Sequence, residues 1–162
     1  IPEKTSGKSG ARLMSLRHPE NKMSKSSDDI NGTIYFNDEK DNILKKFKSS
    51  VTDSENIVRY DPKNKPGISN LIEIYAAVND KEISDTEKEF ENSQYGEFKI
   101  AVAETVIDYL DPIKKNFDDL TSDNLEDIVV SNLKSAKDSA QKTIIEVEEA
   151  LGISWKYFHS CK

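Results

Sequence analysis

Apolar residues recur at steps of three and four along most of the chain after residue 38, which is the period of helices that bury one face. The pattern predicts helices over about 38–51, 68–79, 84–90, 95–120 and 123–151. Polar stretches with Gly, Pro, Asn and Asp separate them, and such stretches are typical of turns. The predicted fold class is therefore mainly α.

Side chains that accept hydrogen bonds from backbone N–H groups mark three of the expected helix starts. Asn37 or Asp38 should cap the first helix. A Ser84-x-x-Glu87 capping box should open the third, and Asp123 is expected to cap the last.

The two longest predicted helices carry the longest apolar faces. The helix over 95–120 places on one face Phe98, Val102, Val106, Tyr109, Ile113, Phe117 and Leu120. The helix over 123–151 is expected to bury Leu125, Ile128, Val129, Leu133, Ala136, Ala140, Ile144, Val147 and Leu151. Pro112 should kink the first of these helices, and Gly152 suits the left-handed residue that follows the second.

Shorter elements are expected in the first third of the chain. Residues 12–16 alternate polar and apolar side chains, as a short strand would, and residues 33–36 form a second extended piece. The helix that follows should bury Ile43, Leu44, Phe47 and Val51. Its lysines, Lys45, Lys46 and Lys48, are expected on a solvated face near the helix C-terminus.

Composition limits the classes of protein that fit. The 162 residues suit one domain, and no apolar run approaches the roughly 20 residues of a membrane-spanning helix, so a cytoplasmic protein without membrane contact is expected. Cys161 is the only cysteine and His18 and His159 the only histidines, so the chain predicts neither a disulfide framework nor a closed zinc site.

Charge is distributed unevenly along the sequence. Residues 1–48 contain 10 Lys/Arg and 7 Asp/Glu, a net charge of +3, whereas residues 49–162 contain 13 and 23, a net charge of −10. Phosphate binding needs local positive charge. Any phosphate-binding chemistry is therefore expected near the N-terminus.

Two lysine-containing loops in this basic region could bind phosphate. Residues 6–9 (S-G-K-S) fail as a phosphate-binding loop because Pro2 stands where the pattern requires its first glycine, so a flexible loop is expected there. Residues 22–26 (K-M-S-K-S) place two ammonium groups three residues apart among small hydroxyls, and this arrangement suits a polyphosphate.

Further motifs accompany the K-M-S-K-S loop in a fixed order. They are G-A-R-L-M-S-L before it at 10–16, and V-T-D-S-E at 51–55, K-P-G-I-S-N-L at 65–71 and Y-G-E-F-K at 95–99 after it. With these motifs the chain, over about residues 10–153, resembles the C-terminal half of bacterial-type tryptophanyl-tRNA synthetases, which are class I aminoacyl-tRNA synthetases.

The resemblance implies a two-step reaction. Tryptophan and ATP give tryptophanyl-adenylate and pyrophosphate, and the tryptophanyl group then passes to tRNA(Trp). Lys22 and Lys25 would be the catalytic residues, because they would neutralise charge on the pyrophosphate leaving group. Ser24 and Ser26 would donate hydroxyl hydrogen bonds to ATP.

The same resemblance assigns two further ATP contacts. Leu13 and Met23 would hold the adenine and ribose side of ATP through backbone groups, although both could also serve as packing residues. Mg²⁺ would accompany ATP, with no metal site built from the protein alone.

The resemblance also implies a division into domains. Residues 1–36 would end an α/β Rossmann-like catalytic domain, residues 37–153 would form a helical, anticodon-binding-type bundle, and residues 154–162 would be a tail of unknown status. The family's first signature, H-I-G-H, has no counterpart in the sequence. The chain is thus expected to be a fragment, inactive alone, of an enzyme that is a homodimer.

The expected tRNA contacts lie on the last helix. Lys134, Lys137 and Gln141 form a stripe at the flank of its apolar face, where a tRNA backbone could lie. The acidic surroundings favour the alternative, a simply solvated flank. The alternative function is a helical protein-interaction module whose K-M-S-K-S loop is incidental.

Overall fold

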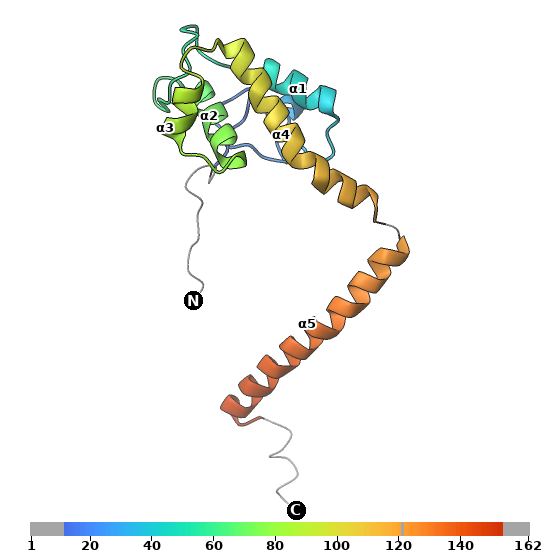
Figure 1. Cartoon of the computed structure of the whole chain (residues 1–162). Coiled ribbons are helices and arrows are strands. Elements are labelled where there is room, and N and C mark those ends of the chain that lie inside the picture. The colour runs from blue at the N-terminus through green and yellow to red at the C-terminus, as the bar shows by residue number, and fades with distance from the viewer. Residues whose placement is uncertain (1–11, 121, 154–162) are drawn as a thin grey trace, which may run out of the picture. The chain divides into compact units, whose positions relative to one another are not determined.

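The structure, a computed structural model, describes residues 12–120 and 122–153, and of residues 122–124 the backbone alone. The loop at residues 6–9 and the tail at 154–162 therefore lie outside the described residues. The side chain of Asp123 does too, but its backbone lies inside the last helix and not at the expected N-cap. Within these limits the chain forms a short 3₁₀ helix, Ile30–Gly32, and the α-helices α1 (Lys40–Lys48), α2 (Pro66–Val78), α3 (Ile83–Glu89), α4 (Tyr95–Asp118) and α5 (Ser122–Leu151) (Figure 1).

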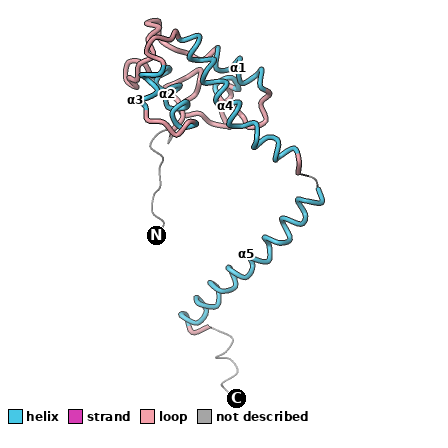
Figure 2. Tube along the Cα trace, viewed as in Figure 1, coloured by secondary structure: helices cyan, strands magenta, loops and turns pink. Residues whose placement is uncertain are grey.

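The mainly α fold class is confirmed, because helices and loops account for the described residues (Figure 2). The strand expected at residues 12–16 is reduced to one antiparallel bridge between Met14 and Lys22. Residues 33–36 make no strand either, and the chain turns at Phe36 and Asn37. None of the described helices is long and apolar enough to cross a membrane.

The chain divides into two compact units, Ile1–Lys115 and Asn116–Lys162. In the first unit Leu16, which precedes the K-M-S-K-S loop, belongs to the same buried cluster as residues of α1, α2 and α4. The loop region and the helices up to Lys115 thus share one core. The expected domain boundary at residues 36 and 37 stays a prediction about the whole protein.

Helix α2 is the centre of the first unit. Nine of its thirteen residues are buried, among them Ile68, Leu71, Ile72 and Tyr75. Pro66 fits the first turn, where its missing N–H costs no hydrogen bond. Phe90, which follows α3, packs partly buried against this core, with its ring centroid 5.0 Å from that of Tyr75.

Lys46 corrects the expectation of a solvated lysine face on α1. Its side chain is only 1% exposed, and its ammonium donates to Thr33 O at 2.8 Å and to Asp38 Oδ2 at 2.6 Å. Lys45 and Lys48 are exposed as expected. Sequence periodicity failed at Lys46 because its burial depends on the carboxylate of Asp38, eight residues away, and not on the helix pattern.

The caps expected for α1 and α3 are also wrong. The residue at the N-cap of α1 is Glu39, since Asp38 is occupied by Lys46 and by the Tyr35 N–H. The residue at the N-cap of α3 is Glu82, and Ser84 lies inside the helix. Glu87 does not reach back along α3, because its Oε1 accepts from the Tyr60 N–H at 2.7 Å.

The apolar face predicted for α4 is buried in its first half. Phe98, Val102 and Val106 belong to the core of the first unit. Tyr109, Ile113 and Phe117 are exposed, as is Leu120, which follows the helix. Pro112 lies inside α4, and the kink expected there stays a prediction.

Helix α5 has no buried face among its described side chains. Its apolar residues, such as Leu125, Leu133 and Leu151, are 40% exposed or more, so the expected core face is wrong for this chain by itself. The described part of its unit contains only α5 and the last residues of α4, so little is there to cover it. The C-terminal glycine is confirmed: Gly152 has φ +70°, and the N–H of Ile153 donates to Glu148 O, as in a Schellman motif.

Gly67 is expected to tolerate no side chain. A Cβ at this position would lie 2.1 Å from the Val51 carbonyl oxygen, so Gly67→Ala should lower the free energy of unfolding by about 1–3 kcal/mol, the usual cost of overpacking. Gly96→Ala is the matched control, because a Cβ there meets nothing within 4 Å. Urea unfolding of both variants measures the difference. Equal stability of the two variants would contradict the close approach at Gly67.

Candidate functional site

The K-M-S-K-S loop begins on the second arm of a small hairpin. The Ser15 N–H donates to Asn21 O at 2.8 Å, and the Met23 N–H donates to Leu13 O at 3.0 Å. Between them Met14 and Lys22 form the isolated bridge. The hairpin fixes the backbone on both sides of residues 16–20 and places Lys22 opposite Met14 and Met23 opposite Leu13.

A tight turn follows directly. The Ser27 N–H donates to Ser24 O at 3.2 Å, which places Lys25 and Ser26 at the tip. Thr33 Oγ1 donates to the same carbonyl at 3.1 Å, and the hydroxyls of Ser24 and Ser26 lie 3.0 Å apart. The base of the turn is therefore held by hydrogen bonds, while its tip presents hydroxyl groups and one ammonium to solvent.

Lys22 and Lys25 are both exposed, and among the described residues neither has a hydrogen-bond or ion-pair partner. This distinguishes them from Lys46 and Lys65, whose charges are compensated within the protein. Two uncompensated cations three residues apart can bind a polyanion without first breaking an internal ion pair.

Leu13 and Met23 link the loop to the core. Both side chains are partly buried and pack against the apolar cluster, so the packing role considered for them is confirmed. They also line an apolar hollow of about 230 Å³, together with Ile34, Tyr35, Phe36, Phe47, Ile74, Val78, Val106 and Leu110. The hydrogen bond between them uses the Met23 N–H and the Leu13 carbonyl. Their backbone contacts to ATP stay a prediction. The backbone groups that this hydrogen bond does not use are the Leu13 N–H and the Met23 carbonyl.

The motifs downstream of the loop hold its base in place. Asn70, in the 65–71 motif, accepts from the Met14 N–H and donates to the Met14 carbonyl, both at 2.8 Å. The Leu16 carbonyl accepts from the N–H of Val51, the first residue of the 51–55 motif, at 2.8 Å. Lys99, the last residue of the 95–99 motif, donates to Ser50 O at 2.7 Å. Two downstream motifs therefore bond to the hairpin directly, and the third bonds to Ser50, the residue before Val51.

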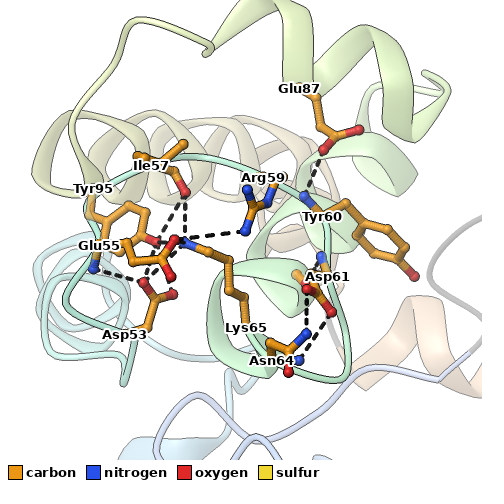
Figure 3. A network of polar contacts seen from close by, with 11 residues as sticks. Asp53, Glu55, Ile57, Arg59, Tyr60, Asp61, Asn64, Lys65, Glu87 and Tyr95 are labelled. Carbon is orange, nitrogen blue, oxygen red and sulfur yellow. Dashed lines mark hydrogen bonds and ion pairs between the residues drawn. The ribbon is translucent and has the colours of Figure 1, made fainter.

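Three of these motifs meet at a buried lysine (Figure 3). The Lys65 ammonium lies 3.1 Å from Asp53 Oδ1 and 2.8 Å from Glu55 Oε2, and it donates to the Tyr95 hydroxyl at 3.0 Å. Tyr95 in turn donates to the Asp53 carboxylate at 2.8 Å. The Lys65 side chain is 2% exposed, so this cation is neutralised within the fold and unavailable to a ligand.

The electrostatics of this network follow from burial and hydrogen bonding together. Burial opposes the Lys65 charge, but hydrogen bonds to Glu55, Tyr95 and Asp53 outweigh it and hold the pKa of Lys65 above the ordinary lysine value. Burial likewise opposes the charge of Asp53, yet hydrogen bonds from the Glu55 N–H, Tyr95 and Lys65 hold the pKa of Asp53 below its ordinary value. Burial and the bond to Asp53 raise the pKa of Tyr95.

Sequence reasoning missed this network and the Asn70 clamp. The motif order carried the only available signal, since the motifs marked Asp53, Lys65, Asn70 and Tyr95 without showing that they meet. The remaining predicted site residues lie elsewhere: Lys134, Lys137 and Gln141 are exposed on α5, in the second unit. Among the described residues, no three His, Cys, Asp or Glu side chains are grouped so that they could hold a metal ion.

Acid should weaken the network at Asp53. A carboxyl whose pKa is lower in the folded state contributes stability above its unfolded pKa and loses that contribution as pH falls through its folded pKa. Asp53→Asn should therefore be less stable than the unaltered chain at pH 7, and the difference should shrink below the ordinary aspartate value of 3.8. Urea unfolding between pH 7 and pH 3 measures it, with the exposed Asp119→Asn as control. A stability difference that is independent of pH would remove Asp53 from the ion-pair network.

The chain matches known proteins over most of its length. Residues 3–111 match the family model described as tRNA synthetases class I (W and Y). It is 45% identical over 157 residues to the tryptophan–tRNA ligase of Oceanobacillus iheyensis, a match that covers 96% of this chain and 48% of that protein. It is 41% identical to the enzyme of the same name from Bacillus subtilis, with the same coverage.

A solved structure gives the same result. The crystal structure of tryptophanyl-tRNA synthetase from Mycoplasma pneumoniae matches with a TM-score of 0.82 and 26% sequence identity, over 93% of this chain and 46% of that one. The chain thus spans about half the length of the relatives it matches. On the family match to residues 3–111, it belongs to the class I tRNA synthetases of the W and Y family.

Proposed function

We propose that this chain is the ATP-loop and helical part of a tryptophan–tRNA ligase. The observation that carries the proposal is the pair of exposed, uncompensated lysines, Lys22 and Lys25, on a turn whose base is braced by the other family motifs. The names of the relatives support tryptophan as the amino acid and tRNA(Trp) as its acceptor.

The first step of the proposed reaction is electrostatic in its demands. A carboxylate oxygen of tryptophan attacks the α-phosphorus of ATP, and the bond to the bridging oxygen of pyrophosphate breaks. Negative charge then grows on the leaving group, where Lys22 and Lys25 would neutralise it and Ser24 and Ser26 would donate hydrogen bonds. The protein needs to supply no nucleophile and no general base for this step.

The loop fits an ATP polyphosphate by its donor set, because it offers two ammonium groups, hydroxyls and the exposed tip of a turn. Leu13 and Met23 would contribute backbone groups on the adenine and ribose side. Mg²⁺ would enter with the phosphates of ATP. In the second step the tryptophanyl group leaves the adenylate for a ribose hydroxyl of the tRNA, and AMP departs.

The remaining features of the proposal concern the whole enzyme. We propose a homodimer that works in the cytoplasm, with residues 1–36 completing a Rossmann-like catalytic domain and the helices binding tRNA. The alternative is a helical interaction module, which the exposed apolar residues along α5 would also fit. An apolar helix face can also be covered by the other half of an enzyme, so it does not favour the module over the ligase.

The Lys25→Ala substitution tests the proposed role of the loop. The chain should be joined to the N-terminal half of the Bacillus subtilis relative, and adenylate formation followed in a single turnover and by tryptophan-dependent ATP–pyrophosphate exchange. Lys25→Ala should slow adenylate formation by roughly 10²–10³, about 2.7–4 kcal/mol, and weaken ATP binding far less, because the charge it meets grows in the transition state.

Two controls make the result interpretable. Lys63→Ala, an exposed lysine outside the loop, should leave exchange unchanged, and the 162 residues alone should show none. Robust exchange by the isolated chain, or an unchanged single-turnover rate in Lys25→Ala, would contradict the proposed division of the active site.

A second substitution tests the tRNA contacts proposed on α5. In the joined enzyme, Lys134→Glu with Lys137→Glu should weaken tRNA binding. It should also lower the slope of log K against log salt by the contribution of about one to two phosphate contacts, where each contact contributes about 0.9 on a duplex or 0.7 on a single strand. Adenylate formation should stay unchanged, which separates a tRNA defect from misfolding. An unaltered salt slope would mean that the stripe is a solvated flank.

A further inference from the structure

A second group of exposed cations, without ion-pair partners among the described residues, lies in the first unit. Arg17, Lys45 and Lys48 line an open hollow of about 490 Å³, together with the polar side chains of Asn31, Asn42 and Ser49. We call this site the basic hollow. Its cations come from two elements, because Lys45 and Lys48 lie on α1 and Arg17 lies in the hairpin.

Backbone hydrogen bonds hold the two elements together. The residue before Arg17, Leu16, donates its N–H to Gly32 O at 2.9 Å and accepts at its carbonyl from the Val51 N–H at 2.8 Å. These bonds fix Arg17 beside the 3₁₀ helix that contains Asn31 and beside the chain that leaves α1. Lys45 and Lys48 are three residues apart on α1 and so share one face of it. The arrangement is thus imposed by the fold.

The cations of the hollow differ from neighbouring lysines in that they are not held in ion pairs. Lys40 pairs with Asp111 at 2.8 Å, and Lys114 pairs with Glu39 at 2.9 Å. Lys46, which also lines the hollow, directs its ammonium to Asp38. In contrast, the side chains of Arg17, Lys45 and Lys48 have no ion-pair partner among the described residues, and all three are exposed.

The dipole of α1 explains these charges only in part. Lysines in a last helical turn complement the partial negative charge there, which is about half an elementary charge. That explanation covers Lys45 and Lys48 but not Arg17, which lies on another element. Three full positive charges around one hollow exceed what the helix end requires, so the residues that line the hollow carry a net positive charge.

We propose that the basic hollow binds the phosphodiester backbone of the tRNA substrate. This inference rests on the proposed function, and it names a contact region separate from the stripe on α5. Arg17 suits a phosphate because its guanidinium can donate two parallel hydrogen bonds, while Lys45 and Lys48 supply charge and Asn31, Asn42 and Ser49 supply neutral hydrogen bonds.

A nucleic-acid backbone fits the hollow better than a free nucleotide does. None of the described residues that line it has an aromatic ring on which a base could stack. Its cations are spread over an open surface, which suits successive phosphates of one strand. The strongly acidic balance of residues 49–162 would also direct a polyanion toward this N-terminal region.

The test uses the 162-residue chain and a tRNA(Trp) transcript, with binding measured by fluorescence anisotropy over a series of KCl concentrations. Lys45→Ala with Lys48→Ala should weaken binding and lower the slope of log K against log salt by about one to two, the contribution of two phosphate contacts. Arg17→Ala, on the other element, should lower the slope by about one. Thermal unfolding should be unchanged, since the three side chains are exposed.

The matched control removes the same charge elsewhere. Lys63→Ala with Lys88→Ala changes two exposed lysines outside the hollow and should leave the salt slope unchanged. If both double variants lose the same affinity and the same salt slope, the proposal is overturned, because binding would then depend on net charge alone. Failure of the unaltered chain to bind the transcript would also overturn it, as would displacement of the transcript by ATP at constant ionic strength.

The outcome can be separated from that of the proposed function. In the enzyme joined to the Bacillus subtilis N-terminal half, the basic-hollow variants should keep full pyrophosphate exchange. If the joined enzyme catalyses pyrophosphate exchange but these variants bind tRNA normally, the basic hollow is rejected as a tRNA site and the proposed function stands. Absence of exchange in the joined enzyme would instead reject the proposed function.

Discussion

The ion pairs around Lys65 are the constraint on which the first unit depends. A lysine that is 2% exposed would be costly without partners, and here Asp53, Glu55 and Tyr95 surround its ammonium. These partners come from segments up to 30 residues apart from Lys65 in sequence. The network therefore ties the start of α2 to the loop before it and to the start of α4. It fixes where α2 lies, and α2 carries the Asn70 side chain that clamps the hairpin.

The loop and the network divide their tasks. Lys46 and Lys65, whose charges are paired, hold elements together, whereas Lys22 and Lys25 are exposed and have no partner among the described residues. A rigid base under a small polar tip suits the proposed chemistry, because the charges are delivered to a defined place while the tip can still adapt to a ligand. The basic hollow, on α1 and the hairpin, likewise contains exposed cations that have no ion-pair partner among the described residues.

Sequence periodicity predicted where helices form but not what each helix buries. The helices α2 and α4 begin within a few residues of the expected positions, because apolar spacing and Pro66 act locally. Lys46 and Lys65 could not be placed, since their burial depends on carboxylates 8 and 12 residues away. The caps of α1 and α3 failed for a related reason: Asp38 and Glu87 are engaged by other parts of the chain. The K-M-S-K-S residues were recognisable because a family motif consists of consecutive residues, whereas burial depends on residues that are distant in sequence.

Helix α5 has a consequence for how stability is distributed along the chain. Thirty residues of helix without a buried side chain among those described depend on propensity and on the Schellman end at Gly152 rather than on packing. Local opening of such a helix costs little free energy, whereas opening of α2 requires the core and the Lys65 network to break. Amide protons of α5 should therefore exchange with solvent deuterium well before those of α2. Among the described helices, α5 is thus the one whose order a binding partner can change most.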